Sequence, residues 1–146
     1  MAVAALITWL ITAAGGFYML GTWIAKGGTR TPRTTRFPAP VIFGHFGLAA
    51  AGLVIWIIFV INDAKGLAWT AFVLLLPVAL LGFVMLARWL PTYQATRHAV
   101  AVGAGADTKA ATASAAPERH FPIVLVAGHG LLAVTTLVLV FVSAIR

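Results

Sequence analysis

The sequence contains no cysteine and few charged residues, and both absences narrow the classes of protein that it can encode. Without cysteine, the chain can form no disulfide, iron–sulfur cluster, thiolate zinc site or covalently attached c-type haem. Only 9% of the residues are charged while 62% are hydrophobic, a balance far outside the range of soluble domains. The composition therefore predicts an integral membrane protein.

Acidic residues are scarcer still, and none falls inside a long apolar stretch. The three are Asp63, Asp107 and Glu118, and we expect all of them in connecting loops. Because proton- or cation-coupled transport generally uses carboxylates within the membrane, these positions argue against a coupled transporter. The sequence also lacks a Ser/His/Asp grouping, a phosphate-binding glycine loop and a zinc-hydrolase spacing, so it offers no candidate catalytic residues.

Four apolar stretches are long enough to cross a bilayer, which takes roughly 20 helical residues. They cover residues 3–25, 39–61, 67–90 and 121–144. The first has no basic residue ahead of it and is too long for a signal peptide, so we expect it to be retained. We predict one membrane domain over residues 1–146, an all-α bundle of four transmembrane helices, with a flexible Ala-rich cytoplasmic loop at about 98–118.

The basic residues gather in two of the three connections. Eight lie in or beside the first and third connections, and two lie on the opposite side. The eight are Lys26, Arg30, Arg33, Arg36, Arg88, Arg97, Lys109 and Arg119, and the two are Lys65 and Arg146. The positive-inside rule places the basic loops in the cytoplasm and both termini outside. Because topology explains the net charge of +7, we expect contact with anionic lipid headgroups and no nucleic-acid partner.

The second half of the sequence repeats the first. Residues 37–54 and 121–138 share the pattern FP-x5-GH-x2-LA-x3-LV, identical at 8 of 18 positions, at an offset of 84. Residues 16–24 and 82–90 share GF-x-ML-x2-W, identical at 5 of 9 positions, at an offset of 66. The sequence therefore predicts a duplicated two-helix hairpin.

The two hairpins, over residues 1–61 and 67–146, would each cross the membrane twice and so enter it from the same side. Parallel copies of this kind are related by a pseudo-twofold axis along the membrane normal. Packing alone explains the matched small residues, since these let membrane helices approach closely. It does not readily explain why histidine, methionine and tryptophan are also kept in register.

Each copy carries one histidine inside an apolar helix. His45 and His129 would lie about 9 Å from the cytoplasmic interface, because each helix begins near a proline and rises 1.5 Å per residue. Met19 and Met85, on helices that run the other way, fall about 6–9 Å deep. The histidine faces carry small residues toward the membrane centre, which would leave room for a flat apolar group. These small residues are Ala49, Gly52, Ala133 and Thr136.

The first interpretation of the pair is coordination of a b-type haem by both imidazoles. Neutral imidazole is a good ligand for iron, and the second ring nitrogen of each ligand could donate to a carbonyl of its own helix, near Val41 or Leu125. The porphyrin would fill the gap over the small residues. Its propionates would reach the cytoplasmic rim, where basic residues suit carboxylates. These basic residues are Arg36, its repeat counterpart His120, and the nearby Arg33 and Arg119.

Two other interpretations remain open. Two imidazoles and the thioethers of Met19 and Met85 would form a soft site suited to Cu(I), although methionine on a helix face is more often a gap filler. Alternatively, His45 and His129 hydrogen-bond across the bundle and no cofactor is bound, in a structural or accessory membrane subunit. Interhelical hydrogen bonds in membranes average well under ~1 kcal/mol, so stability alone is a weak reason for both histidines.

The favoured prediction is a small cytochrome of b type in a bacterial plasma membrane, with haem b between the second and fourth helices. The arrangement resembles b-type membrane cytochromes in architecture alone, through its four helices and paired histidines. We expect a one-electron carrier, or the membrane-anchor subunit of an oxidoreductase, rather than a stand-alone enzyme. Quinol, a larger redox complex and a second copy of the chain are the partners compatible with this prediction.

Overall fold

The computed structural model describes residues 1–30, 34–101 and 116–146. Most of the loop expected at 98–118, with Asp107 and Lys109, lies outside the described residues, and so does Arg33. Four long helices make up the fold, and each is long and apolar enough to cross a membrane. They are α1 (Ala2–Ala25), α2 (Ala39–Asn62), α3 (Lys65–Ala101) and α5 (Ile123–Ile145), joined by the short 3-10 helix η1 (Pro117–His120). The prediction of an all-helical chain with four long apolar helices is confirmed.

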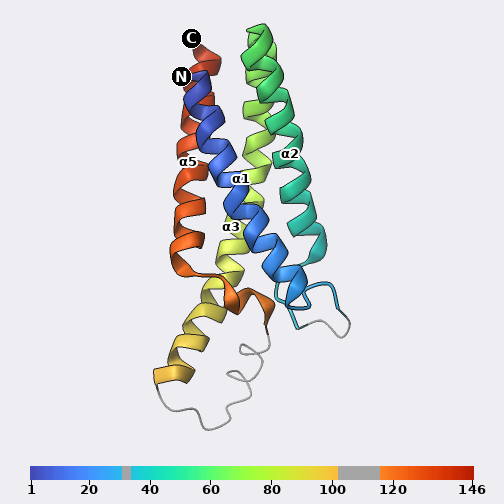
Figure 1. The fold of residues 1–146 in the computed structure, drawn as a ribbon, viewed down its shortest axis with the longest axis vertical. Coiled ribbons are helices and arrows are strands. Elements are labelled where there is room, and N and C mark those ends of the chain that lie inside the picture. Colours follow the sequence, from blue (N-terminus) through green and yellow to red (C-terminus); the bar gives the residue numbers. More distant parts are fainter. Residues whose placement is uncertain (31–33, 102–115) are drawn as a thin grey trace.

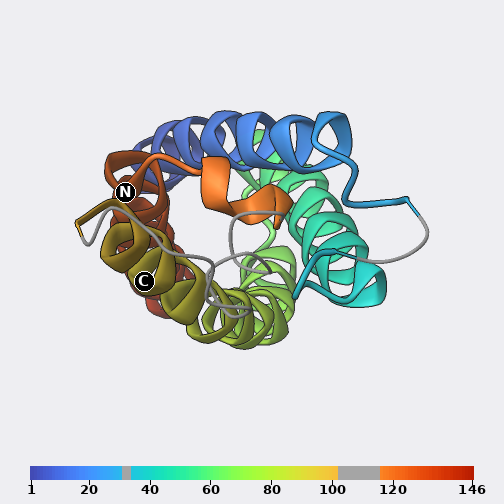
Figure 2. The same ribbon diagram turned by 90° about the horizontal axis from the view of Figure 1, so that it is seen from below.

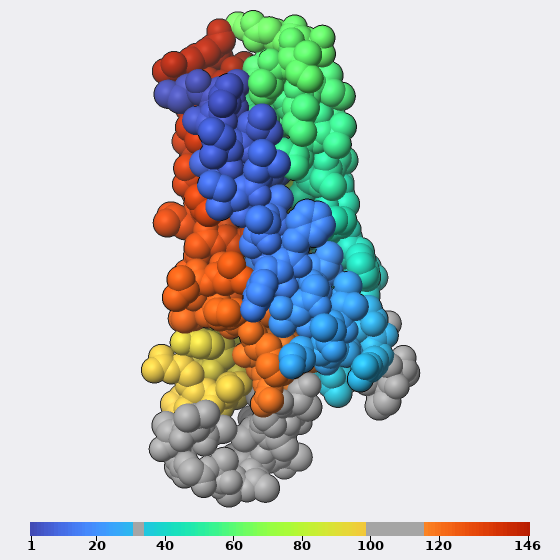
Figure 3. Space-filling view, viewed as in Figure 1, coloured from blue at the N-terminus to red at the C-terminus, as the bar shows by residue number. Residues whose placement is uncertain are grey.

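The four helices stand side by side, with both termini at one end and η1 at the other, which we call the loop end (Figure 1). The closest packing joins α2 to α3 and α1 to α5, while α3 also contacts α5 and α1 contacts α2. Along the bundle axis, this order places α1 diagonally opposite α3 and α2 diagonally opposite α5 (Figure 2). The space-filling view shows α1 lying along α5 on one face of the molecule (Figure 3). The two histidine-bearing helices therefore face each other across the centre.

Local sequence explains where α2 and α5 begin and where α2 ends. Pro38 and Pro122 precede their helices with nearly the same extended backbone, and their carbonyls accept the first helical hydrogen bonds. Proline suits this place because the first helical amides have no partner within the helix. At the other end of α2, Asp63 takes the left-handed conformation (φ 53°) and donates its backbone N–H to the Phe59 carbonyl. This turn leads directly into α3.

Helix α3 is longer than the apolar stretch that predicted it. The expected end was residue 90, but the helix continues through Pro91 to Ala101. Its polar extension is stabilised by side chains one turn apart: Trp89 stacks on Tyr93 at a centroid distance of 4.8 Å, and Arg97 lies 5.9 Å from the Tyr93 ring centre. Hydropathy marks the apolar part of a helix, and it does not show how far the helix continues into polar sequence.

The bundle has two apolar clusters. The larger surrounds Trp9, Trp56 and Phe59 near the termini, and the smaller, which we call the lower cluster, lies at the loop end. The lower cluster consists of Trp23, Phe37, Ile42, Trp89 and Phe121. His45 and His129 follow Ile42 and Val126 by three residues, so they lie between the two clusters.

Candidate functional site

His45 on α2 and His129 on α5 meet across the centre of the bundle. Their ring centroids are 6.3 Å apart and their planes are inclined at 50°. Both side chains are half-buried. The two residues are 84 positions apart in the chain, which is the offset between the two histidine-bearing stretches.

Each imidazole is held by a neighbouring helix. His45 donates from Nδ1 to the backbone carbonyl of Val78 on α3 (2.9 Å), and His129 donates from Nδ1 to that of Thr12 on α1 (3.0 Å). The expectation that these bonds would go to the histidine's own helix was wrong. Thr12 and Val78 are themselves 66 positions apart, which is the offset between the first helices of the two repeats. Each histidine is therefore anchored to the other repeat.

Glycines explain why the neighbouring carbonyls are within reach. A Cβ atom built at Gly16 would lie 3.2 Å from Cε1 of His129, and one at Gly82 would lie 3.4 Å from Cε1 of His45. The distance at Gly16 is shorter than ordinary van der Waals contact and that at Gly82 is at its lower limit, so a side chain larger than a methyl group would press on the imidazole at either position. Gly16 and Gly82 open the two GF-x-ML motifs. The sequence showed the repeat of these glycines but gave no indication that each accommodates the other repeat's histidine.

The hydrogen bonds also determine which ring nitrogen carries the proton. A backbone carbonyl only accepts hydrogen bonds, so Nδ1 of each neutral ring must be the protonated nitrogen. Nε2 of His45 and of His129 then each carry a lone pair. Two lone pairs cannot hydrogen-bond to each other. The tautomer of the neutral pair therefore excludes a direct hydrogen bond between the two Nε2 atoms.

The methionines lie nearer the loop end than the histidines. Met19 and Met85 follow Gly16 and Gly82 by three residues, and both are half-buried against the lower cluster. Packing between aromatic rings is a common role for a thioether.

The small residues expected to leave room for a flat group are largely covered by the protein itself. A Cβ at Gly52 would lie 3.1 Å from the Trp9 indole, so the flat apolar group over this face is a tryptophan. Thr136 is buried, and its hydroxyl lies 2.9 Å from that of Thr8. Ala49 packs against the larger apolar cluster, and Ala133 is half-buried.

Of the basic residues expected near the haem propionates, the described ones, Arg36, Arg119 and His120, lie at the loop end, and the lower cluster separates them from the histidines. Arg119 and His120 are exposed, with His120 donating from Nδ1 to the Pro117 carbonyl (3.1 Å). Arg36 lines a pocket beside α3. The structure thus brings His45 and His129 together but does not bring these three side chains to them.

Sequence reasoning missed Glu118. We expected it in a connecting loop, and its side chain is in fact fully buried at the loop end. One carboxylate oxygen accepts the Thr35 hydroxyl (2.9 Å) and the other accepts the Arg36 backbone N–H (2.7 Å). The Trp23 indole donates to Thr35 (2.9 Å), and the Trp89 indole donates to the Glu118 carbonyl (3.1 Å). The available signal was the pair of tryptophans, since a buried indole N–H needs an acceptor.

The pair offers the lone pairs of two imidazole nitrogens. Within residues 1–30, 34–101 and 116–146, no group of three or more histidine, aspartate or glutamate side chains is placed to hold a metal ion. Comparison of the chain with known protein families, with functionally curated proteins and with solved structures found no match, so the site rests on its own geometry.

Proposed function

We propose that the protein is a small multi-pass membrane protein in which His45 and His129 coordinate one b-type haem through their Nε2 atoms. It would act as a one-electron carrier or as the membrane anchor of a larger oxidoreductase. The observation that carries the proposal is the facing pair of imidazoles, each with Nδ1 bonded to a backbone carbonyl.

Insertion in a membrane is supported by the surface of the bundle. Large apolar side chains are exposed on all four helices, among them Ile61 (76%), Val124 (80%) and Leu131 (70%). A helix that is apolar on all sides would bind lipid on the faces that do not pack against protein. Except for Lys65 and Arg146, the described basic residues belong to the loop end, which favours that end as the cytoplasmic one.

The separation of the imidazoles suits a metal between them. A metal ion lies about 2 Å from a coordinating imidazole nitrogen, and the ring centre lies roughly 1 Å beyond it, so opposed ligands have centroids about 6 Å apart. The observed distance is 6.3 Å. A hydrogen bond from Nδ1 to a backbone carbonyl is also the usual second contact of a metal-binding histidine, because it fixes the ring and makes Nε2 more basic.

Haem is favoured over a bare ion because the protein supplies only two strong ligands. A tetrahedral Zn²⁺ site in a protein needs at least three protein ligands, whereas haem brings four nitrogens of its own and needs only two axial ones. Gly16 and Gly82 lie against the same two atoms, Cε1 and Nδ1, of the imidazoles of His129 and His45, so the two rings pack in the same way. Bound haem would supply one-electron redox chemistry, while this chain would set ligand orientation and exclude water.

Cu(I) is the second candidate, and the specific observation in its favour is the position of Met19 and Met85. Each lies one helical turn from a glycine that contacts a histidine. Thioethers and imidazoles together suit Cu(I). Metal analysis of the same purified protein separates copper from haem iron.

The test is optical spectroscopy of protein purified in mild detergent from cells supplied with a haem precursor. We expect a reduced-minus-oxidised spectrum of low-spin b type, which His45→Ala and His129→Ala each abolish or convert to high spin. His120→Ala is the matched control, because His120 is exposed at the loop end and should leave the spectrum unchanged. A folded wild type that stays colourless after haem loading would refute the haem proposal.

A further inference from the structure

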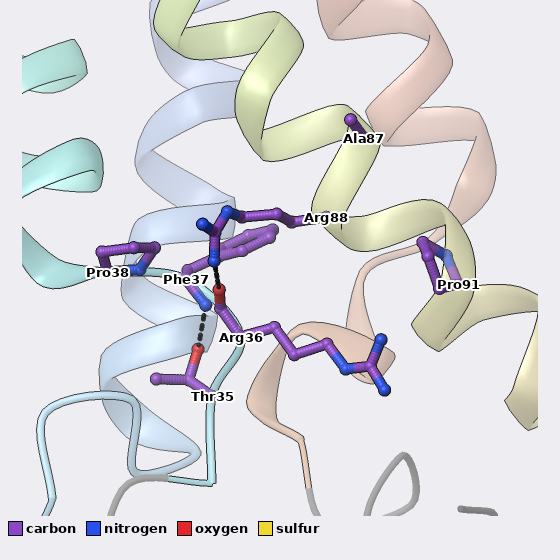
Figure 4. Close-up of a pocket in the computed structure, with 7 residues that line it drawn as sticks. All are labelled: Thr35, Arg36, Phe37, Pro38, Ala87, Arg88 and Pro91. Carbon is purple, nitrogen blue, oxygen red and sulfur yellow. Dashed lines mark hydrogen bonds between the residues drawn. The ribbon is translucent and has the colours of Figure 1, made fainter.

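A pocket at the loop end carries an inference that is independent of the histidines. It has a volume of about 460 Å³ and lies between the start of α2 and the later part of α3 (Figure 4). Two of its lining side chains are arginines and none is acidic. The lining residues are Thr35, Arg36, Phe37, Pro38, Ala87, Arg88 and Pro91.

The backbone of Arg36 is fixed from two sides. Arg88 donates from Nη1 to the Arg36 carbonyl (3.0 Å), and the Arg36 N–H donates to the buried Glu118 carboxylate (2.7 Å). Both Glu118 oxygens accept hydrogen bonds from the segment of residues 35–36, through the Thr35 hydroxyl and the Arg36 amide. In Figure 4 the Arg88 side chain reaches from α3 to the Arg36 carbonyl, while the Arg36 side chain extends the other way, toward the side of Pro91. The Arg88 guanidinium is thus held at the pocket by the Arg36 carbonyl, and the contacts that fix the Arg36 backbone do not use the charge of its side chain.

The pocket lies where the apolar sequence ends. Pro38 immediately precedes α2, and Pro91 follows the last apolar residues of α3. In a membrane this is the depth of the headgroups, as the neighbouring Trp89 also indicates. From the pocket, exposed apolar side chains continue along one face of α3 at helical spacing, through Val84 and Leu80. A cationic pocket is therefore followed along α3 by an exposed apolar stripe.

We propose that this pocket binds an anionic phospholipid, with Arg36 and Arg88 on the headgroup phosphate and an acyl chain along the Val84 and Leu80 face. Guanidinium groups suit phosphate because they donate two parallel hydrogen bonds to it, and basic pockets between membrane helices are known headgroup sites. The apolar stripe favours a lipid over free phosphate. The proposal rests on the membrane insertion proposed above and does not depend on the metal centre.

The test is lipid retention by delipidated protein, measured by native mass spectrometry after equilibration with mixed micelles of phosphatidylglycerol and phosphatidylcholine. We expect phosphatidylglycerol to be retained at least about tenfold better than phosphatidylcholine, since each charge-assisted contact is strong. The double variant Arg36→Gln/Arg88→Gln should lose this preference. Arg36→Lys/Arg88→Lys, which keeps the charge, should retain part of it and shows that loss is not misfolding.

The matched control is Arg30→Gln/Arg97→Gln, which removes the same charge from the same end but outside the pocket. It should bind phosphatidylglycerol as the wild type does. Equal loss in both double variants would overturn the proposal in favour of unspecific attraction to the basic end. Displacement of the lipid by millimolar inorganic phosphate would overturn it in favour of a free-phosphate site. Because the measurement needs no haem, its failure leaves the histidine proposal untouched.

Discussion

The histidine level and the loop end of the bundle use repeat-related residues in different ways. At the histidine level, positions related by the repeat make the same contacts: each imidazole donates to the first helix of the other repeat and packs on its glycine. At the loop end, Trp23 donates to the Thr35 side chain, whereas Trp89 donates to the Glu118 carbonyl. The contacts of the two repeats are therefore equivalent at the histidine level and different at the loop end.

The largest expected effect comes from removing the carboxylate at the loop end. Glu118→Leu would leave the Arg36 N–H and the Thr35 hydroxyl without their acceptor in a buried place, at a cost of about 2–4 kcal/mol in the free energy of unfolding. Thermal or denaturant unfolding in detergent measures this loss. Asp63→Asn is the control, since Asp63 is exposed and asparagine tolerates its left-handed backbone. Similar stability of the two variants would show that Glu118 does not hold the loop end together.

The next effect concerns the equivalence of the two histidine environments. Gly16→Val and Gly82→Val would each push an imidazole away from its carbonyl, and loss of such a supporting contact typically weakens metal affinity about 10- to 100-fold. Haem titration of the purified variants measures the affinity, and we expect similar losses in both. Gly21→Val is the control, because a Cβ there meets no atom within 4 Å. A loss at only one of the two glycines would break the equivalence of the two sides.

The smallest expected effect concerns the two tryptophans at the loop end, which donate hydrogen bonds to different acceptors. Trp23→Phe and Trp89→Phe each remove one hydrogen bond, at about 1 kcal/mol of unfolding free energy. A double-mutant cycle with Thr35→Val distinguishes the two tryptophans, because groups in direct contact give non-additive effects. We expect the stronger coupling for Trp23 with Thr35, which are hydrogen-bonded to each other, and weaker coupling for Trp89 with Thr35, which share only Glu118 as a partner. Equal coupling in both cycles would contradict the difference in acceptors.

The sequence was sufficient to predict the four helices and the meeting of His45 with His129. Hydropathy and helix rise give the position of each histidine along its helix. The internal repeat then places the two histidines at equivalent positions. It could not predict that Trp9 covers Gly52, because this contact depends on how α1 leans on α2. Nor could it predict the burial of Glu118, since a charged residue beside an arginine and a histidine is typical of a solvated loop. Its burial depends on partners 82 and 83 positions away in the chain.

The sequence pattern also could not predict the extension of α3 or the hydrogen-bond acceptors of the two imidazoles. Pro91 usually marks the end of a helix, but here stacking of Trp89, Tyr93 and Arg97 accompanies its continuation. The carbonyls of Thr12 and Val78 carry no side-chain signal at all. Backbone acceptors of this kind can be recognised only once the neighbouring helices are in place.

The most direct test of the central claim is the electron paramagnetic resonance spectrum of the oxidised, haem-loaded protein, with its histidines labelled with ¹⁵N. The account predicts a low-spin ferric signal with nitrogen couplings from two imidazoles, and one haem per chain. His45→Ala and His129→Ala should each give a high-spin signal, while His120→Ala should match the wild type. A high-spin wild type, or a low-spin signal that survives in either single variant, would contradict coordination of one haem by this pair.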